Sequence, residues 1–512
     1  MKYNWKLSGL AALVLTVVAC TDLDEDLKGD FTSNFTTVSY VRSNVNKLPP
    51  NDGLGGAFSR ILNGTANHGS YFSVQEVSSD EAVITQKGGD WFDGGIWLRM
   101  HRHQFDPQVG GINGAWNDSY GGITQCNSLL ASTDPQVSTP AAKAQLRFLR
   151  AYFYWRLLDV FGRVKLTTQP LVDVPQSTRL QVYNFVESEL LAAIPDLPTA
   201  KEEYGRVNQY GAYALLSRLY LNAKVYKGLS SFDNADLDKA IDAADEVINS
   251  GLYTLDVNYK DVFDPDNIDA KETIFVAPFD ELTGEGMNFA QMTLHYPSQL
   301  TFDLRDQPWN GYSTLEEFYN SYDAADARRA QNFIVGPQED LNGNPILDLA
   351  FDPADEDGAE INYTPKINQL QPSGSRQAGA RLGKFNFKKG QLPNMDNDYP
   401  ILRLGEVLLN KAEALHRKGD NSGLALVNQL RARAGVANLA SLTDATLLAE
   451  RGRELFQEAL RRTDLIRFGV WGNAWWEKPA HSDPNKNVMP IPVEQINATA
   501  GSAFPLTQNP GY

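Results

Sequence analysis

Apolar residues recur at helical spacing along much of this 512-residue chain, and this pattern constrains the fold more than any other feature. In residues 141–162 a helix of 3.6 residues per turn would gather one apolar stripe. The stripe consists of Leu146, Leu149, Phe153, Leu157 and Val160. The same spacing returns in residues 182–194, 208–223 and 235–250. The pattern predicts a mostly α-helical protein.

Residues that commonly begin and end helices flank two of these segments. Asn208 is predicted to cap the helix that follows it, because an Asn side chain accepts hydrogen bonds from free backbone N–H groups. Ser250 and Gly251 are predicted to end the last segment. Small residues stand where neighbouring helices would cross. The paired helices therefore look like degenerate tetratricopeptide (TPR) units without a regular period.

Four more helices are predicted outside this group. Residues 111–132 place Trp116 close to one apolar face, so Trp116 is predicted to lie in the core. Helical spacing returns near the C-terminus in residues 399–417, 421–434 and 444–468. These segments complete the expectation of a helical scaffold.

The last of these segments is rich in charged residues. Glu450 lies three residues before Arg453, and Glu458 lies four residues before Arg462. Side chains at these separations meet on the surface of a helix. The spacing predicts ion pairs on the helix surface, with a structural and not a catalytic role.

Residues 261–395 differ from the rest because they are rich in Gly, Pro, Asn and Asp and contain only short apolar runs. A long irregular stretch inside a compact domain is commonly a functional surface carried by a scaffold. The expected organisation is one globular domain over residues 37–512. TPR-like helices would cover about 37–260, the binding region about 261–395, and C-terminal helices about 396–512.

The N-terminus is predicted to carry an export signal. Residues 1–19 place two lysines before a short apolar run, as in a signal peptide. The run ends in Val-Val-Ala-Cys and resembles the bacterial lipobox, which predicts lipidation of Cys20; an ordinary secretory signal is the alternative. The only other cysteine is Cys126, which argues against a disulfide. The acidic residues in 20–36 predict a tether and resemble the surface-export signal of Bacteroidetes lipoproteins.

The charge balance restricts the classes of ligand. The formal net charge is −17 at pH 7. Nucleic-acid binding needs a concentrated basic surface, so the sequence argues against DNA or RNA as a partner. The same balance disfavours polyanionic ligands such as alginate or sulfated glycans.

Motifs of catalytic or cofactor chemistry are missing from the sequence. It contains no G-x-S-x-G, H-E-x-x-H, C-x-x-C or G-x-x-x-x-G-K-[ST]. We expect no cofactor and no enzyme activity, although a glycosidase needs only two suitably spaced carboxylates and stays the alternative class. Asp340, Asn342 and Asn344 alternate as in a calcium loop, but Pro345 and Phe351 replace the expected Gly and Glu. A structural calcium ion therefore remains a minor alternative.

Several segments, in this order, resemble the SusD/RagB family of Bacteroidetes outer-membrane lipoproteins. They are WNDSYGGITQCNSLL (116–130), LRAYFYWRLLDVFG (149–162), NQYGAYALLSRLYL (208–221), YPILRLGEVLLNKAEAL (399–415), NQLRARAG (428–435), ERGRELFQEALRRTDLIRFG (450–469) and the closing NVMPIPVEQINAT…LTQNPGY (487–512). The resemblance implies a SusD-like fold, in which TPR-like pairs form a scaffold for a loop-rich binding region.

The resemblance also implies a function. Family members bind polysaccharide or oligosaccharide at the cell surface and sit over a SusC-like TonB-dependent importer, and they are not enzymes. The expected localisation is the outer membrane, with a lipid anchor and exposure at the cell surface. RagB-type relatives are thought to deliver peptides, so peptide uptake is one alternative. A TPR scaffold lipoprotein without a nutrient ligand is another.

Aromatic residues in two loop segments are the candidate ligand contacts. Sugar rings have apolar C–H faces that lie flat on aromatic rings, while their hydroxyl groups need polar side chains at the rim. GGDWFDGGIW (88–97) places two tryptophans among glycines, where burial is poor, and the family commonly has a binding aromatic there. The predicted contacts are Trp91, Trp97, Tyr296, Trp309, Asn310 and Tyr312. The predicted ligand is a largely neutral glycan, with laminarin and other β-glucans ahead of fructans and xylans.

Overall fold

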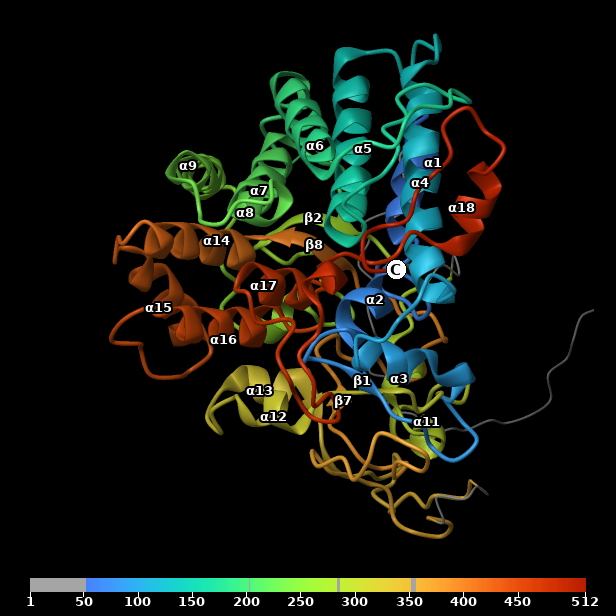
Figure 1. Ribbon diagram of the computed structural model, residues 1–512. Coiled ribbons are helices and arrows are strands. Elements are labelled where there is room, and N and C mark those ends of the chain that lie inside the picture. The colour runs from blue at the N-terminus through green and yellow to red at the C-terminus, as the bar shows by residue number, and fades with distance from the viewer. Residues whose placement is uncertain (1–51, 202, 283–285, 351–355) are drawn as a thin grey trace, which may run out of the picture. The chain divides into compact units, whose positions relative to one another are not determined.

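The computed structural model describes residues 52–512 apart from 202, 283–285 and 351–355. The predicted signal peptide (1–19), the lipidation site Cys20 and the tether (20–36) lie outside the described residues. Helices dominate the described chain, and the strands are short (Figure 1). In this described part, none of the helices combines the length and the apolar character needed to cross a membrane.

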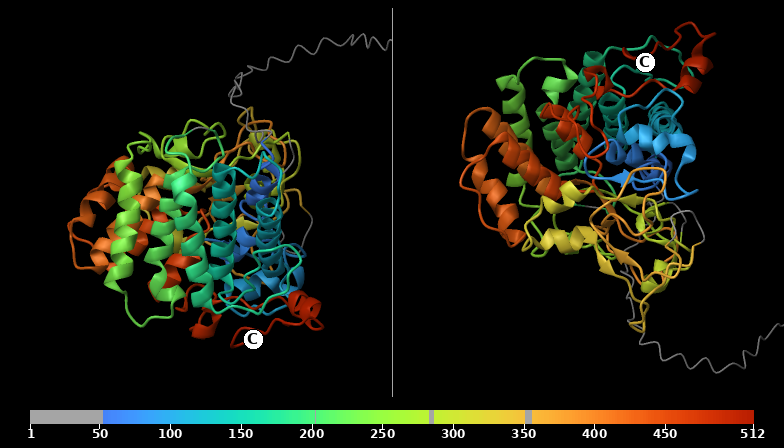
Figure 2. Two further views of the ribbon diagram at one scale, coloured as in Figure 1. Left: turned by 90° about the horizontal axis from the view of Figure 1, so that it is seen from above. Right: turned by 60° about the horizontal axis from the view of Figure 1, so that its bottom comes forward.

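Five long helices follow one another and pack in sequence order. They are α4 (Gly110–Leu130), α5 (Pro140–Val160), α6 (Arg179–Ala193), α7 (Gln209–Leu221) and α9 (Asn234–Asn249), with the short α8 (Ala223–Tyr226) after α7. The left view of Figure 2 shows these helices side by side. The helices predicted from the apolar spacing are thereby confirmed.

The helix ends follow from local hydrogen bonds. The Asn208 side chain accepts hydrogen bonds from the N–H groups of Tyr210 (3.1 Å) and Gly211 (3.3 Å), which confirms the predicted cap of α7. At the end of α9, Ser250 is the C-cap and Gly251 adopts a φ of 66°, which glycine reaches without steric cost.

Small residues allow these helices to approach closely, as expected. A Cβ atom on Gly122 of α4 would lie 2.3 Å from the Phe153 ring of α5. A Cβ on Gly423 would lie 2.7 Å from the carbonyl oxygen of Ala412, at the crossing of α14 (Leu404–Arg417) and α15 (Gly423–Arg433). Glycine is therefore required for close packing at both crossings.

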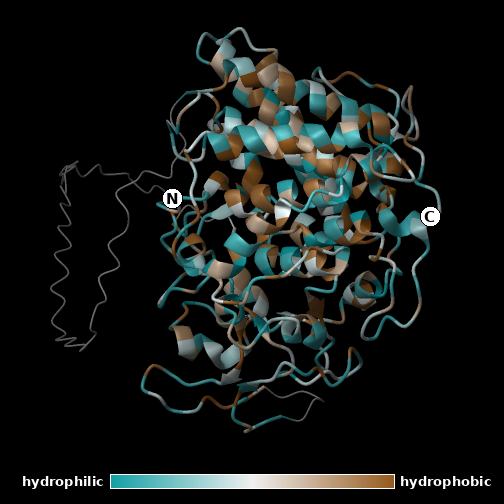
Figure 3. Cartoon of the chain, turned by 90° about the vertical axis from the view of Figure 1, so that its left-hand side faces the viewer, coloured by the Kyte–Doolittle hydropathy of each residue, from teal (hydrophilic) through white to brown (hydrophobic). Residues whose placement is uncertain are grey.

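The apolar faces of the helices meet in one extended core. Trp116 of α4 is 4% exposed, which confirms its predicted place there. Figure 3 shows polar and apolar residues alternating along the helices. Charged side chains are also buried between helices: Arg218 of α7 donates to both carboxylate oxygens of Glu406 on α14, at 2.6 Å each. Such a pair fixes the relative position of two helices, because water cannot reach either buried charge to replace its partner if the helices move apart.

The predicted helix over 399–417 was wrong in its first turn. Tyr399–Arg403 form strand β8, which pairs antiparallel with β2 (Thr273–Ala277), and α14 begins only at Leu404. All five residues of β8 are buried. A strand buried on both faces reads as a continuous apolar run, which spacing alone does not separate from the start of a helix.

The predicted helix over 444–468 is interrupted. It consists of α16 (Asp444–Leu455) and α17 (Arg461–Arg467), and Gln457 and Ala459 between them have φ values of 61° and 57°. These left-handed conformations are incompatible with a continuing helix.

Buried carboxylates from the start of the chain hold this interruption in place. Glu76 accepts a hydrogen bond from the Ala459 N–H at 2.8 Å, and Glu81 accepts one from the Gln457 N–H at 3.2 Å. Glu76 belongs to α2 (Tyr71–Val77). The interruption therefore depends on residues more than 370 positions away, since these two bonds join residues 383 and 376 positions apart.

One of the two predicted ion pairs forms. Arg453 lies 2.7 Å from Glu450. The predicted pair of Glu458 with Arg462 was wrong, because the helix ends before it: Glu458 pairs with Lys384 and Arg403, and Arg462 pairs with Asp159 at 3.2 Å.

The predicted irregular region contains β2 and several other short α-helices and strands. They are α10 (Phe289–Thr293), α11 (Gln299–Phe302), α12 (Glu316–Asn320), α13 (Ala327–Asn332), β3 (Tyr312–Ser313), β4 (Phe333–Ile334), β5 (Gly336–Pro337), β6 (Asn362–Tyr363) and β7 (Arg381–Leu382). Strand β3 pairs with β1 (Val83–Ile84), which precedes α3 (Ile96–His101). The remaining helices are α1 (Gly55–Phe58) and α18 (Val493–Thr499). The β1–β3 pair brings the two aromatic loop segments together.

Candidate functional site

The glycine-rich segment after β1 is a tightly turned loop. Lys87 and Asp90 exchange two backbone hydrogen bonds of 3.0 Å around Gly88 and Gly89. Beyond this turn the backbone has φ values of 60° at Trp91, 45° at Asp93, 63° at Gly94 and 79° at Gly95. Repeated left-handed residues reverse the chain within a few positions. The loop thus separates its two tryptophans, leaving Trp91 half-buried and Trp97 buried.

The second aromatic segment is fixed through its backbone. The N–H groups of Trp309, Asn310 and Gly311 donate to the carbonyl oxygens of Gln291 (2.7 Å), Leu294 (2.9 Å) and Met292 (2.9 Å). These bonds attach the segment to α10 and its end. The Trp309 ring stays accessible, with 39% of the residue exposed.

Two contacts hold Trp91 against this segment. Its indole N–H donates to the carbonyl oxygen of Trp309 at 2.6 Å. A Cβ on Gly311 would lie 2.4 Å from Cζ2 of the Trp91 ring, so the ring occupies the space that the missing side chain leaves. Buried Lys87 donates to the Gly311 carbonyl at 3.0 Å, and burial holds the pKa of this lysine well below its usual value.

An open pocket of about 510 Å³ lies at this junction. We call it the aromatic pocket, and it is lined by His68, Asp90, Trp91, Asp93, Tyr296, Gln307, Pro308 and Trp309. The Tyr296 hydroxyl donates to the Asp90 carboxylate. The structure therefore brings three of the predicted contacts, Trp91, Tyr296 and Trp309, into one pocket.

The other three predicted contacts are buried, which corrects the expectation that they present a surface to ligand. Trp97 is 2% exposed, and Tyr312 and Asn310 are fully buried. Trp97 donates its indole N–H to Asp93 at 2.8 Å and so orients a carboxylate of the pocket. Asn310 has a φ of 57°, and its role is the turn between Trp309 and β3. Spacing along a loop did not reveal which side chains turn inward.

His68 was missed by sequence reasoning, although it lies at the centre of the aromatic cluster. Its ring centroid is 4.8 Å from that of Trp97, 5.2 Å from Trp91, 5.7 Å from Tyr312 and 6.4 Å from Trp309. Burial lowers its pKa to about 4, against an opposing contribution from Asp93. A lone histidine in the segment NGTANHGS matches no motif, so the sequence held no signal for it.

The aromatic pocket has an acidic lining. Its lining contains two carboxylates, Asp90 and Asp93, and no lysine or arginine. His68 is neutral at physiological pH because its pKa is low. The pocket therefore combines aromatic faces with hydrogen-bond acceptors and carries no cation for an anionic ligand.

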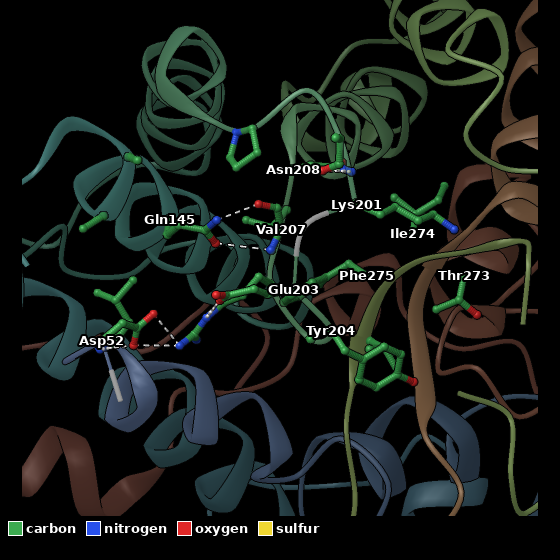
Figure 4. A pocket seen from close by; sticks show the side chains of 18 of the residues that line it. Asp52, Gln145, Lys201, Glu203, Tyr204, Val207, Asn208, Thr273, Ile274 and Phe275 are labelled. Atoms are coloured by element: carbon green, nitrogen blue, oxygen red, sulfur yellow. Dashed lines mark hydrogen bonds and ion pairs between the residues drawn. The ribbon is translucent and has the colours of Figure 1, made fainter. Parts of the chain in front are cut away.

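A second pocket lies elsewhere, between the start of α5 and β2 (Figure 4). Its volume is about 380 Å³. The Arg206 guanidinium donates to both oxygens of Asp52, at 2.8 and 2.7 Å, and the Gln145 side chain makes two hydrogen bonds with the backbone of Val207. These contacts hold the loop that carries Arg206 and Val207 against α5, and we assign the pocket a structural role in packing.

Metal ligands do not cluster in the described residues, where no group of three or more His, Cys, Asp or Glu side chains is placed to hold an ion. In the loop that resembles a calcium site, the Asp340 carboxylate accepts hydrogen bonds from the backbone N–H groups of Asn342 (2.8 Å) and Asn344 (2.9 Å). Its oxygens thus stabilise the turn itself.

Comparison with known proteins gives matches along most of the chain. The model described as SusD family matches residues 270–512, and the model described as starch-binding associating with outer membrane matches residues 61–221. The starch-binding protein SusD of Bacteroides thetaiotaomicron is 28% identical over 435 residues, which cover 76% of each chain.

Solved structures share the fold. Surface glycan-binding protein A from Bacteroides thetaiotaomicron, solved in complex with laminarihexaose, has a TM-score of 0.69 at 23% identity. A laminarin-binding SusD-like protein has a TM-score of 0.70 at 23% identity. Each match covers 90% of this chain and 98% of the other. The predicted mostly helical fold is thereby confirmed.

Proposed function

This chain belongs to the SusD/RagB family, and from that premise we propose that it is a cell-surface lipoprotein that captures a glycan in the aromatic pocket. It would deliver the bound polysaccharide or oligosaccharide to a SusC-like TonB-dependent importer in the outer membrane. Its role would be binding without catalysis. The anchor in this proposal is a lipid on Cys20.

The observation that carries the proposal is the meeting of Trp91, Tyr296 and Trp309 around one open pocket with acidic groups at its edge. An aromatic side chain offers ~150–250 Å², and covering half of it with a sugar gains about 2–3 kcal/mol before losses. Immobilising the ligand removes much of this gain. Several rings in one pocket are therefore needed, and this site supplies three.

The charge of the pocket supports a neutral ligand. The carboxylates of Asp90 and Asp93 accept hydrogen bonds from sugar hydroxyl groups and repel a uronic acid or a sulfate ester. We propose a β-glucan of the laminarin type, in keeping with the laminarihexaose-bound and laminarin-binding relatives of the same fold. Starch, named for the relative from Bacteroides thetaiotaomicron, is the competing neutral glucan.

Affinity electrophoresis tests the proposal directly. The protein is run in native gels that contain laminarin, starch, xylan, inulin or alginate, and retardation by laminarin but not by alginate is expected. Trp309→Ala should weaken binding about tenfold, which corresponds to roughly 1.4 kcal/mol. Trp476→Ala is the control, because Trp476 is a half-buried tryptophan that lies outside the aromatic pocket.

The outcomes separate the candidate functions. Binding of peptides with no retardation by any glycan would favour RagB-type peptide uptake. If the protein bound neither peptides nor glycans but associated stably with other envelope proteins, a scaffold role would be favoured. Gentle detergent extraction tests the partner, since the proposed complex predicts co-purification with a SusC-like barrel.

A further inference from the structure

Four groups form one line of hydrogen bonds behind the aromatic pocket. The Gly69 backbone N–H donates to Ser73 Oγ at 2.8 Å, and this oxygen lies 2.7 Å from the Tyr312 hydroxyl. The Tyr312 hydroxyl in turn lies 2.9 Å from Nδ1 of His68. Ser73 and Tyr312 are fully buried, whereas the His68 ring reaches the pocket.

The direction of this line is set by its first member. A backbone amide only donates, so Ser73 Oγ accepts from Gly69, and the Ser73 proton needs another acceptor. Within the described structure the only other partner of Ser73 Oγ is the Tyr312 oxygen. The Tyr312 proton then points to His68 Nδ1. The reverse order would leave a buried hydroxyl proton without an acceptor, which is unfavourable.

The protonation states agree with this order. Burial raises the pKa of Tyr312, so its hydroxyl keeps the proton that it donates. Burial lowers the pKa of His68 to about 4, so the ring is neutral at physiological pH and carries one N–H. Because Nδ1 accepts from Tyr312, that N–H is on Nε2. Among the described residues, Nε2 has no hydrogen-bond partner.

We propose that His68 is a specificity-determining residue that presents Nε2–H to a sugar oxygen as a fixed hydrogen-bond donor. This rests on the proposed glycan-binding function. The carboxylates of Asp90 and Asp93 only accept hydrogen bonds, so His68 adds a donor of defined position to the pocket. A glycan is then selected for an acceptor oxygen at His68 and for hydroxyl donors toward the carboxylates.

The tautomer is measured without ligand. The full chain is labelled with ¹⁵N-histidine, and the ring signals of His68 are identified among the six histidines by their loss in His68→Gln. The expected shifts are those of a neutral Nε2–H ring. In Tyr312→Phe, which removes the hydroxyl, Nδ1 loses its donor and its signal should move. An Nδ1–H ring in the parent protein would overturn the proposal.

Binding of laminarihexaose by calorimetry tests the donor. His68→Gln and His68→Asn both remove the ring, but a Gln amide nitrogen reaches the place of Nε2 and an Asn amide nitrogen only that of Nδ1. His68→Asn should bind about three- to tenfold more weakly than His68→Gln. His481→Asn, at an exposed histidine, should bind like the parent. Equal affinities of the two His68 variants would contradict the donor role. A parent that binds no glycan would contradict the proposed function itself, whatever the tautomer.

Discussion

The indole N–H of Trp91 donates a 2.6 Å hydrogen bond to the carbonyl oxygen of Trp309, a residue 218 positions later in the chain. The bond joins the loop after β1 to the segment before β3, so the positions of the two rings depend on each other. It also occupies the polar edge of Trp91. We therefore expect Trp91 to contribute the face of its ring to a ligand and no hydrogen bond.

Gly311→Ala should disturb Trp91 specifically. The new Cβ would lie 2.4 Å from Cζ2 of the indole, and a fused ring cannot yield as a flexible chain does. Overpacking of this kind lowers the free energy of unfolding by about 1–3 kcal/mol. We expect a lower melting temperature and weaker retardation in laminarin gels. Gly89→Ala is the control, because its Cβ would meet nothing within 4 Å. Parent-like binding by Gly311→Ala would mean that the ring position is not required.

Arg403→Met should be among the most destabilising single changes. Arg403 is buried and lies 2.8 Å from Glu454, 2.7 Å from Glu458 and 3.5 Å from Glu272. Removing one partner of a buried ion pair costs about 3–5 kcal/mol, because the remaining charge stays buried. Thermal unfolding measures the loss.

A surface ion pair provides the control for Arg403→Met. Lys239 lies 2.8 Å from Glu187, and its side chain is 51% exposed. Lys239→Met should cost less than about 1 kcal/mol. Similar losses for Arg403→Met and Lys239→Met would show that the buried network adds little to stability.

Glu76→Gln should remove part of the pH dependence of stability. Burial raises the pKa of Glu76 to about 7, with neighbouring Glu458 acting in the same direction and Lys384 opposing it. The folded state therefore favours the protonated acid. Its contribution to stability is complete below the unfolded pKa of about 4.5 and is lost as pH rises through 7.

The Gln variant keeps an oxygen for the Ala459 N–H but does not titrate. Relative to the parent, its melting temperature should rise as the pH goes from 5 to 8. A constant difference between the two proteins over this range would contradict the raised pKa.

Cys20→Ala should release the protein from the membrane. The apolar run that ends in Val-Val-Ala-Cys predicts lipidation, and one acyl chain alone anchors only marginally, so we expect a multiply acylated cysteine. Cell fractionation and palmitate labelling measure the change, and Cys126→Ala serves as the control. Unchanged membrane association of Cys20→Ala would refute the anchor.

Local sequence patterns were sufficient for the long helices. Asn208 capped α7 and Gly251 ended α9 as expected, because caps depend on hydrogen bonds within a few residues. The prediction of one continuous helix over 444–468 was wrong because distant residues, and not local ones, determine the backbone there. Its charged residues keep helical spacing, but Gln457 and Ala459 are turned by carboxylates contributed from the start of the chain.

The candidate site was only partly predictable from the same patterns. Composition and loop context pointed to Trp91 and Trp309, which do line the pocket. Inward or outward orientation depends on φ values and on distant neighbours, so the burial of Trp97 and Tyr312 was not foreseeable. His68 carried no local signal at all, because its importance comes from four rings that two distant segments bring around it.

The hydrogen bonds from Glu76 and Glu81 to the backbone of Ala459 and Gln457 also have a kinetic consequence. They close loops of nearly the whole described chain, and contacts of such high sequence separation form late, since loop-closure entropy opposes them until other structure exists. Glu81 lies just before β1, whose pairing with β3 assembles the aromatic pocket. During synthesis or passage through a translocation channel, the segment that leads into β1 cannot complete its contacts until residues near 459 have emerged. The support beneath the loop that carries Trp91 is therefore completed late in the maturation of this protein.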